Sequence, residues 1–266
     1  MATPTGPKRS LDLASAAGLL LAAAGIIGGF YLEHGRPHQM MGASAAVIVF
    51  GGCLGATLIA SPLPLVKRAI GRLADVFLET SSDYQQLINA LVGYASQARK
   101  DGLVSLEADA SRIDDPFFRK ALMLAIDGAD LQELRSMMEL EIDVSEQNAE
   151  KEARVFEAAG GYAPTIGIIG AVLGLIIVMG NIEDIKKVGE GIAAAFIATI
   201  YGVGSANILF LPAANKIKLR ARSERERREL ILEGVTAIVE GMNPKLIRTK
   251  LEAFTGGEPP TSAAKG

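Results

Sequence analysis

The residue types that perform most enzyme and metal chemistry are sparse in this 266-residue chain. Its two histidines, His34 and His38, have the spacing of metal ligands on a helix, but Pro37 disfavours a helix there and no carboxylate cluster accompanies them. We therefore interpret them as part of a plain loop. The chain has no nucleotide-binding loop, no Cys/His metal spacing and no nucleophile–base pair. This pattern favours a protein that is not an enzyme, needs no cofactor and does not bind nucleic acid.

Ion conduction is a chemistry that the remaining residues could support. Residues 158–182 and 191–215 lack Asp, Glu, Lys, Arg and His entirely, and a short polar connector separates them. A helix of about 25 residues, at about 1.5 Å per residue, covers the hydrocarbon core of a bilayer, which is about 30 Å thick. We predict a transmembrane hairpin. Its hydroxyl and amide groups prefer a protein-facing or wet surface; they belong to Thr165, Thr199, Tyr201 and Asn207.

A pathway for protons normally contains an ionisable residue within the membrane, and these runs have none. Two interpretations stay open at this point. The protein conducts nothing, or a partner helix supplies the titrating carboxylate. Such a helix would pack against the surface that carries hydroxyl groups and the glycines Gly167, Gly170 and Gly174, since small residues let helices approach closely in lipid.

Two earlier uncharged stretches are also long enough to cross a membrane. Residues 13–32 form the first, and the second span is predicted at 40–60, where Gly51 and Gly55 form another small-residue pair. The alanines at 22–24 resemble a signal-peptide cleavage site, but the apolar run continues well beyond them. The single cysteine, Cys53, lies in an apolar run, which favours a packing role. We predict four spans.

The basic residues are concentrated on one side of these spans. The connectors of the opposite side hold only Arg36, Lys186 and Lys187. Because cytoplasmic flanks are enriched in Lys and Arg, we predict that both termini and the 62–157 segment lie in the cytoplasm. The basic flanks are Lys8, Arg9, Lys67, Arg68, Arg72, Lys216, Lys218, Arg220, Arg222, Arg225, Arg227 and Arg228.

The predicted fold class is an all-α polytopic membrane protein with a helical cytoplasmic domain between the second and third spans. Apolar residues recur at helical spacing in that domain, Gly102 and Pro116 delimit helices, and Asp130 is a candidate N-cap for a long helix towards the third span. The predicted ranges are 1–10, a cytoplasmic tail; 11–61, spans one and two; 62–157, the cytoplasmic domain; 158–213, spans three and four; 214–252, C-terminal cytoplasmic helices; and 253–266, a disordered tail.

Several motifs together resemble the A subunits of flagellar motor stators, the MotA/PomA family. The stretch APTIGIIGAVLGL at 163–175 resembles the third span of that family, while ATIYG at 198–202, LPA at 211–213 and ELILEGV at 229–235 resemble the fourth span and the segment after it. RKDGL at 99–103, followed by Leu106 and Glu107, resembles the charged cytoplasmic motif. The resemblance covers residues 10 to about 252 in order.

This resemblance implies a bacterial inner-membrane protein whose five copies surround two B subunits, each bringing one titrating aspartate. It implies that ions pass between the A and B subunits and that the cytoplasmic domain turns the rotor switch protein. Arg99 and Glu107 would contact the rotor with help from Lys100, and Pro164 and Pro212 would couple ion passage to domain movement. The ion pathway would involve Pro164, Ala171 and Thr199, with Thr199 facing the partner's aspartate.

The transported ion is predicted from position 171. Sodium-driven members of the family have threonine where this chain has Ala171, which favours protons. Two alternatives to a stator subunit remain. One is the energising subunit of an outer-membrane transport or Tol-type complex, which resembles the hairpin but has three spans; the other is a non-conducting membrane scaffold.

Overall fold

A computed structural model of the chain describes residues 8–81 and 84–255 and is helical through most of that length. Four helical segments among the described residues are long and apolar enough to cross a membrane; they are Leu13–Leu32, Ala43–Ala60 and windows within Leu131–Gly180 and Ile185–Val239. The predicted all-α membrane fold with four spans is thereby confirmed. One small departure is a two-stranded sheet that pairs β1 (Lys8–Leu11) with β2 (Leu78–Ser81), in segments predicted as tail and helix.

The chain divides into two compact units, which are described separately. The first contains the described parts of residues 1–10, 80–147 and 220–266, and the second contains 11–79 and 148–219. Helices α8 (Leu131–Gly180) and α10 (Leu211–Val239) each contribute one end to either unit. The predicted boundaries at 61 and 157 were placed at the ends of uncharged runs, and they differ from the limits of the compact units. As membrane boundaries they stay a prediction.

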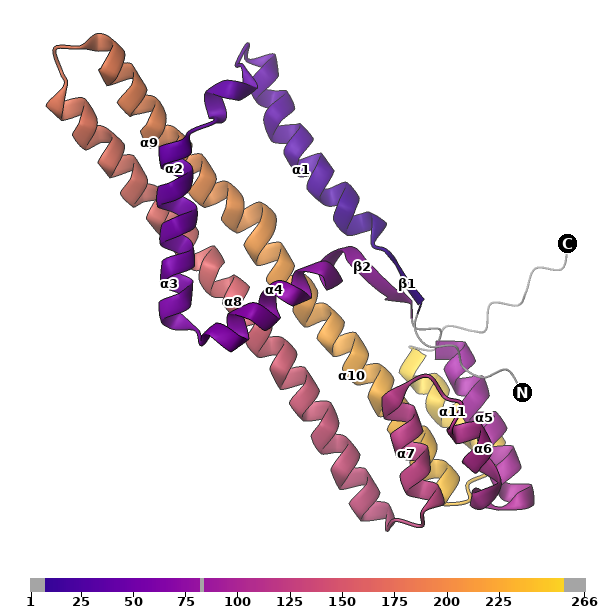
Figure 1. The fold of residues 1–266 in the computed structure, drawn as a ribbon. Coiled ribbons are helices and arrows are strands. Elements are labelled where there is room, and N and C mark those ends of the chain that lie inside the picture. Colours follow the sequence, from indigo (N-terminus) through magenta and orange to yellow (C-terminus); the bar gives the residue numbers. More distant parts are fainter. Residues whose placement is uncertain (1–7, 82–83, 256–266) are drawn as a thin grey trace, which may run out of the picture. The chain divides into compact units, whose positions relative to one another are not determined.

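The second unit holds the four spans. These are α1 (Leu13–Leu32); α2 (Ala43–Ala46), continued by a π-helix (Val47–Gly51) and α3 (Gly52–Ala60); the C-terminal part of α8; and α9 (Ile185–Ser205), continued by a second π-helix (Ala206–Phe210) into α10. In Figure 1, α9 runs back alongside the C-terminal part of α8, and α2 and α3 lie against this pair. Buried Ala45, Val49, Ile197 and Ala198 form one contact between α2–α3 and α9.

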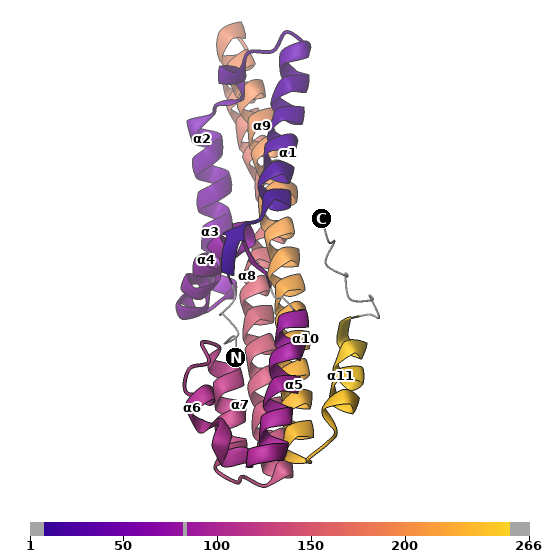
Figure 2. The same cartoon turned by 90° about the vertical axis from the view of Figure 1, so that its right-hand side faces the viewer.

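Helix α4 (Leu63–Phe77) belongs to the second unit as well, although the sequence placed it in the cytoplasmic segment. Its buried residues pack against α8 and α10 in one cluster. Figures 1 and 2 both show α4 running across the direction of the spans rather than along it. The cluster contains Val66, Ala69, Val76, Ala153, Val155, Phe156, Ala213, Ala214 and Ile217.

The first unit is a helical domain with its own apolar core. It comprises α5 (Tyr84–Asp101), a 3₁₀ turn (Leu103–Leu106), α6 (Glu107–Ala110), α7 (Pro116–Ile126), the start of α8, the end of α10, α11 (Pro244–Glu252) and a 3₁₀ turn (Ala253–Thr255). Fully buried Phe118, Leu91, Leu106 and Ile231 come from four of these elements. Burial of such side chains stabilises each by about 1.5–3 kcal/mol relative to exposure.

Local signals explain where several of these helices begin and end. The carboxylate of Asp130 accepts a hydrogen bond from Gln132 N at 2.9 Å, so the predicted cap of α8 is confirmed. Gly102 has a φ of 83° directly after α5, a left-handed conformation that glycine adopts without a Cβ clash. Pro116 begins α7, as predicted.

Three other sequence predictions have different outcomes. His38 lies in a 3₁₀ turn (Pro37–Met40) rather than a plain loop, and no metal-binding group of His, Cys, Asp or Glu occurs among the described residues. A Cβ on Gly51 or Gly55 would meet nothing within 4 Å, so this pair makes no close helix contact with the part of the chain that the structure describes. The predicted disordered tail at 253–266 is wrong at its start, because Ala253–Thr255 form a 3₁₀ turn that continues α11, and the rest of that range falls outside the described residues.

Candidate functional site

The α8–α9 hairpin, which carries the predicted ion-pathway residues, is held together by backbone contact at glycines. A Cβ built on Gly167 would lie 2.9 Å from Ala198 O, and one on Gly202 would lie 2.5 Å from Ala163 O. A Cβ on Gly174 would lie 2.9 Å from Gly191 O. Since each clash is with backbone, a side chain at these positions would force the helices apart. These glycines therefore serve packing within one chain.

The predicted pathway residues Thr199 and Ala171 both lie on this hairpin and are half-buried. The Thr199 hydroxyl donates to Ala195 O, one turn earlier, at 3.2 Å. It can still accept a hydrogen bond, because a hydroxyl oxygen has two lone pairs. Both residues therefore lie on the hairpin, and their part in ion passage stays a prediction.

The two prolines predicted to couple ion passage to movement have different surroundings. Pro164 lies inside the continuous helix α8 and is half-buried, whereas Pro212 is exposed at the start of α10. The π-helix Ala206–Phe210 precedes Pro212, and Leu211 N donates to Ala206 O instead of the carbonyl four residues back. Pro212 has no N–H to donate. At the α9–α10 junction the regular α-helical hydrogen-bond pattern is therefore interrupted at two consecutive residues, Leu211 and Pro212.

The predicted rotor-contacting residues lie in the first unit, around the turn after α5. Arg99 and Lys100 belong to the last turn of α5 and Glu107 begins α6, so Arg99 and Glu107 lie on different helices. All three side chains are exposed, and none forms an ion pair with another described residue. The turn is fixed from within, because the Gln97 amide donates to Ser105 O at 3.1 Å and to Asp109 Oδ2 at 3.3 Å.

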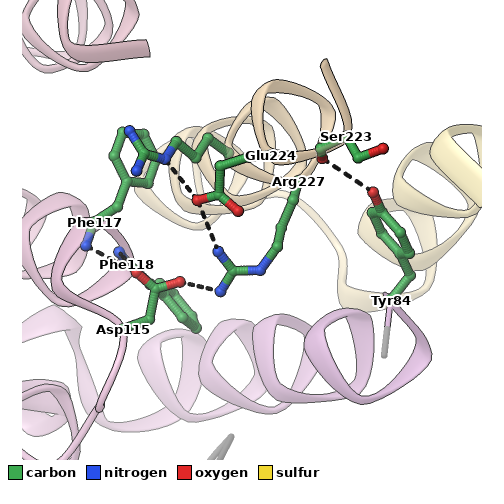
Figure 3. Close-up of polar contacts among 8 residues, drawn as sticks. Tyr84, Asp115, Phe117, Phe118, Ser223, Glu224 and Arg227 are labelled. Carbon is green, nitrogen blue, oxygen red and sulfur yellow. Dashed lines mark hydrogen bonds and ion pairs between the residues drawn. The ribbon is translucent and has the colours of Figure 1, made fainter. Parts of the chain in front are cut away.

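A charged network that sequence reasoning missed joins α7 to α10 (Figure 3). Asp115 accepts hydrogen bonds from Phe117 N and Phe118 N, which caps α7, and it also forms an ion pair with Arg227. Arg227 reaches Glu224 at 3.4 Å, and Glu224 pairs with Arg228 at 2.8 Å. The Arg228 guanidinium lies 5.2 Å from the centre of the Phe117 ring. The sequence indicated a helix start at Pro116 but not the role of Asp115, and Arg227 was interpreted only as a topology signal.

A second network of the same unit surrounds Glu233 on α10. Its carboxylate pairs with Lys250 at 2.6 Å and with Arg135 at 3.0 Å. Burial alone would raise the pKa of Glu233, but the hydrogen bonds and charges of Lys250 and Arg135 outweigh burial and hold the pKa below its ordinary value. Glu233 thereby links α8, α10 and α11.

This network predicts a pH-dependent contribution to stability. A carboxylate with a lowered pKa in the folded state stabilises the protein above its unfolded pKa, and that contribution disappears as pH falls through the folded pKa. We expect Glu233→Gln to lower the midpoint of thermal unfolding at pH 7 and to make a smaller difference near pH 4. Glu240→Gln, which removes an exposed carboxylate seven residues later that forms no ion pair with a described residue, is the control. A difference that grows on acidification would contradict this assignment.

Comparison with known proteins shows to which family the chain belongs. Residues 109–230 match the MotA/TolQ/ExbB proton channel family, and residues 16–102 match the motility protein A N-terminal family. Motility protein A of Helicobacter pylori is 34% identical over 257 residues, which cover 96% of this chain and 100% of the relative. The chain belongs to the motility protein A family.

Solved structures of the motility protein A family agree with this fold over nearly the whole chain. The C. jejuni MotAB structure matches with a TM-score of 0.89 and 30% identity, covering 94% of this chain and 98% of the other. The flagellar MotAB stator complex from Bacillus subtilis matches with a TM-score of 0.85 and 32% identity, covering 93% and 100%. The resemblance stated from the motifs is confirmed. The separate match of the first two spans to the motility protein A N-terminal family distinguishes the chain from a three-span energising subunit.

Proposed function

We propose that this chain is the A subunit of a flagellar motor stator, which converts an ion gradient into torque on the rotor. The observation that carries the proposal is the end-to-end match to a chain solved in a flagellar MotAB stator complex, at 32% identity. Exposed Arg99, Lys100 and Glu107 support it, because unpaired surface charges are suited to a transient contact with a partner of complementary charge.

The partner within the membrane is a B subunit that supplies the titrating aspartate. Two observations support this part of the proposal. The uncharged runs 158–182 and 191–215 contain no Asp, Glu, Lys, Arg or His, and the solved relatives are MotAB complexes. In this arrangement the B-subunit helix packs against the surface of the α8–α9 hairpin, near Ala171 and Thr199. Five copies of the A subunit surround two B subunits, in the bacterial inner membrane, with both termini in the cytoplasm.

Co-expression tests the conducting function. We expect cells that produce this chain with a B subunit to take up protons, measured with a cytoplasmic pH-sensitive fluorescent protein after an external acid pulse. Cells that produce either chain alone, or the pair with the B-subunit aspartate replaced by asparagine, are the controls. Equal uptake in the asparagine variant would contradict the proposal, because the carboxylate would then have no role. A scaffold would show no uptake in any of these cells.

Position 171 predicts the ion. A partly dehydrated sodium ion needs several oxygen ligands, and a methyl group at Ala171 supplies none, whereas a proton needs only the carboxylate that it titrates. We expect motor speed to be unchanged when sodium is replaced by potassium with the proton gradient intact. Rotation that stops in potassium buffer and returns with sodium would show that the motor uses sodium.

A further inference from the structure

Helix α4 has one buried side and one exposed side, and the exposed side has no explanation in the stator function. It begins after Pro62, whose extended backbone (φ −60°, ψ 137°) turns the chain out of α3. Its buried side packs onto α8 and α10 through Val66, Ala69 and Val76. Apolar residues at intervals of three, four and seven are typical of a helix that lies on a surface.

The position of α4 places it at a membrane boundary. It starts three residues after the second span ends at Ala60. Its buried side contacts Ala213 and Ala214, at the end of the uncharged run of the fourth span, and Phe156, just before the run of the third. Both views show it crossing the spans (Figures 1 and 2). An amphipathic helix in this position lies in the plane of the headgroups.

The exposed side of α4 combines basic and apolar residues. Leu63 is 55% exposed and Ile70 is 58% exposed, and exposed Lys67 lies between them at helical spacing, so the three share one face. Arg68 is exposed next to Lys67. Basic side chains beside exposed apolar ones match the polar and apolar parts of a lipid.

Three other basic residues of this boundary are engaged inside the protein. Arg72 pairs with buried Glu152 at 2.8 Å, and Lys216 pairs with buried Asp12 at 2.5 Å. Lys218 pairs with Glu157 at 2.6 Å. These cations are therefore largely neutralised by the protein.

Lys67 and Arg68 differ from these residues, since neither forms an ion pair with any residue that the structure describes. Two exposed cations without an internal counter-ion remain available to an external anion. We propose that the exposed side of α4 binds the headgroups of anionic phospholipids through Lys67 and Arg68, with Leu63 and Ile70 against the acyl chains. The proposal rests on the membrane position of the spans and not on the stator function.

Lipid binding to the full chain in neutral detergent tests the proposal. Native mass spectrometry would give apparent dissociation constants for phosphatidylglycerol and for phosphatidylcholine, which has no net charge. We expect the wild type to prefer phosphatidylglycerol. Because each Lys or Arg near an anionic surface contributes on the order of 5-fold in affinity, the variant Lys67→Gln with Arg68→Gln should bind phosphatidylglycerol about 25-fold more weakly. Its binding of phosphatidylcholine should change little.

Two matched variants make the result specific. Arg112→Gln with Lys245→Gln removes the same charge from exposed positions of the first unit and should keep the wild-type preference. Lys67→Arg with Arg68→Lys conserves the charge and should keep it as well, which assigns the loss to charge, while unchanged binding of phosphatidylcholine by the double glutamine variant excludes a folding defect. The proposal is wrong if the double glutamine variant binds phosphatidylglycerol within twofold of the wild type. It is also wrong if the distant control loses as much affinity, or if the wild type does not distinguish the two lipids.

Discussion

Reversing two exposed charges together, Arg99→Glu with Glu107→Lys, is expected to abolish swimming while the protein accumulates normally. Neither side chain forms an ion pair within the described chain, and exposed pairs contribute only about 0–1 kcal/mol in any case. The loss would therefore arise from repulsion at the rotor contact. The measurement is the rotation rate of tethered cells, with the amount of protein in the membrane determined in parallel.

The control for this experiment is Arg112→Glu, which reverses an exposed charge in the turn after α6 that forms no ion pair with a described residue. It should rotate close to the wild-type rate. A charge reversal at the facing position of the rotor switch protein should restore part of the rotation in the double variant. Normal rotation of the double variant against an unaltered rotor would show that these charges do not contact the rotor.

Placing a methyl group at Gly202 is expected to damage the α8–α9 hairpin severely. The new Cβ of Gly202→Ala would lie 2.5 Å from Ala163 O and 3.0 Å from the Cα of Gly167, and both contacts are with backbone that no side-chain rotation relieves. Overpacking of this kind costs about 1–3 kcal/mol. We expect a lower midpoint of thermal unfolding in detergent and a loss of motility.

Gly204→Ala is the matched control, since it makes the same chemical change two residues later on the same helix. A Cβ there would meet nothing within 4 Å. Alanine also favours a helix over glycine by about 1 kcal/mol, so the control should be as stable as the wild type or more stable. If both variants unfold at the wild-type midpoint, the close backbone contact at Gly202 does not hold the hairpin together.

The sequence determined the membrane fold because the absence of charge is a local property. A run of about 25 residues without Asp, Glu, Lys, Arg or His can be seen residue by residue, and the cost of burying charge in lipid makes it decisive. Helix ends were predictable for the same reason. Asp130 and Gly102 act on the backbone within a few residues of themselves, and the structure shows both effects.

The sequence indicated that Arg99 and Glu107 lie in different elements, because Gly102 lies between them, and the structure shows that both elements are helices. It could not show that Gln97 fixes the turn by reaching Ser105 and Asp109. Nor could it show the π-helix before Pro212, since the irregular hydrogen bond from Leu211 depends on how α9 packs. Pro212 indicated that the helix is irregular near this position, but it did not indicate a π-helix.

Only the tertiary structure decided which charges are paired. Arg227 and Asp115 are 112 residues apart and Lys218 and Glu157 are 61 apart, and pairs at such separations have no local signature. In the sequence, Lys216 and Lys67 are equivalent basic residues beside a span. In the structure Lys216 is held by buried Asp12, whereas Lys67 is exposed on α4 without an ion pair among the described residues. Charge count is fixed by the sequence, but whether a charge is neutralised inside the protein or available to a membrane depends on which distant helices the fold brings together.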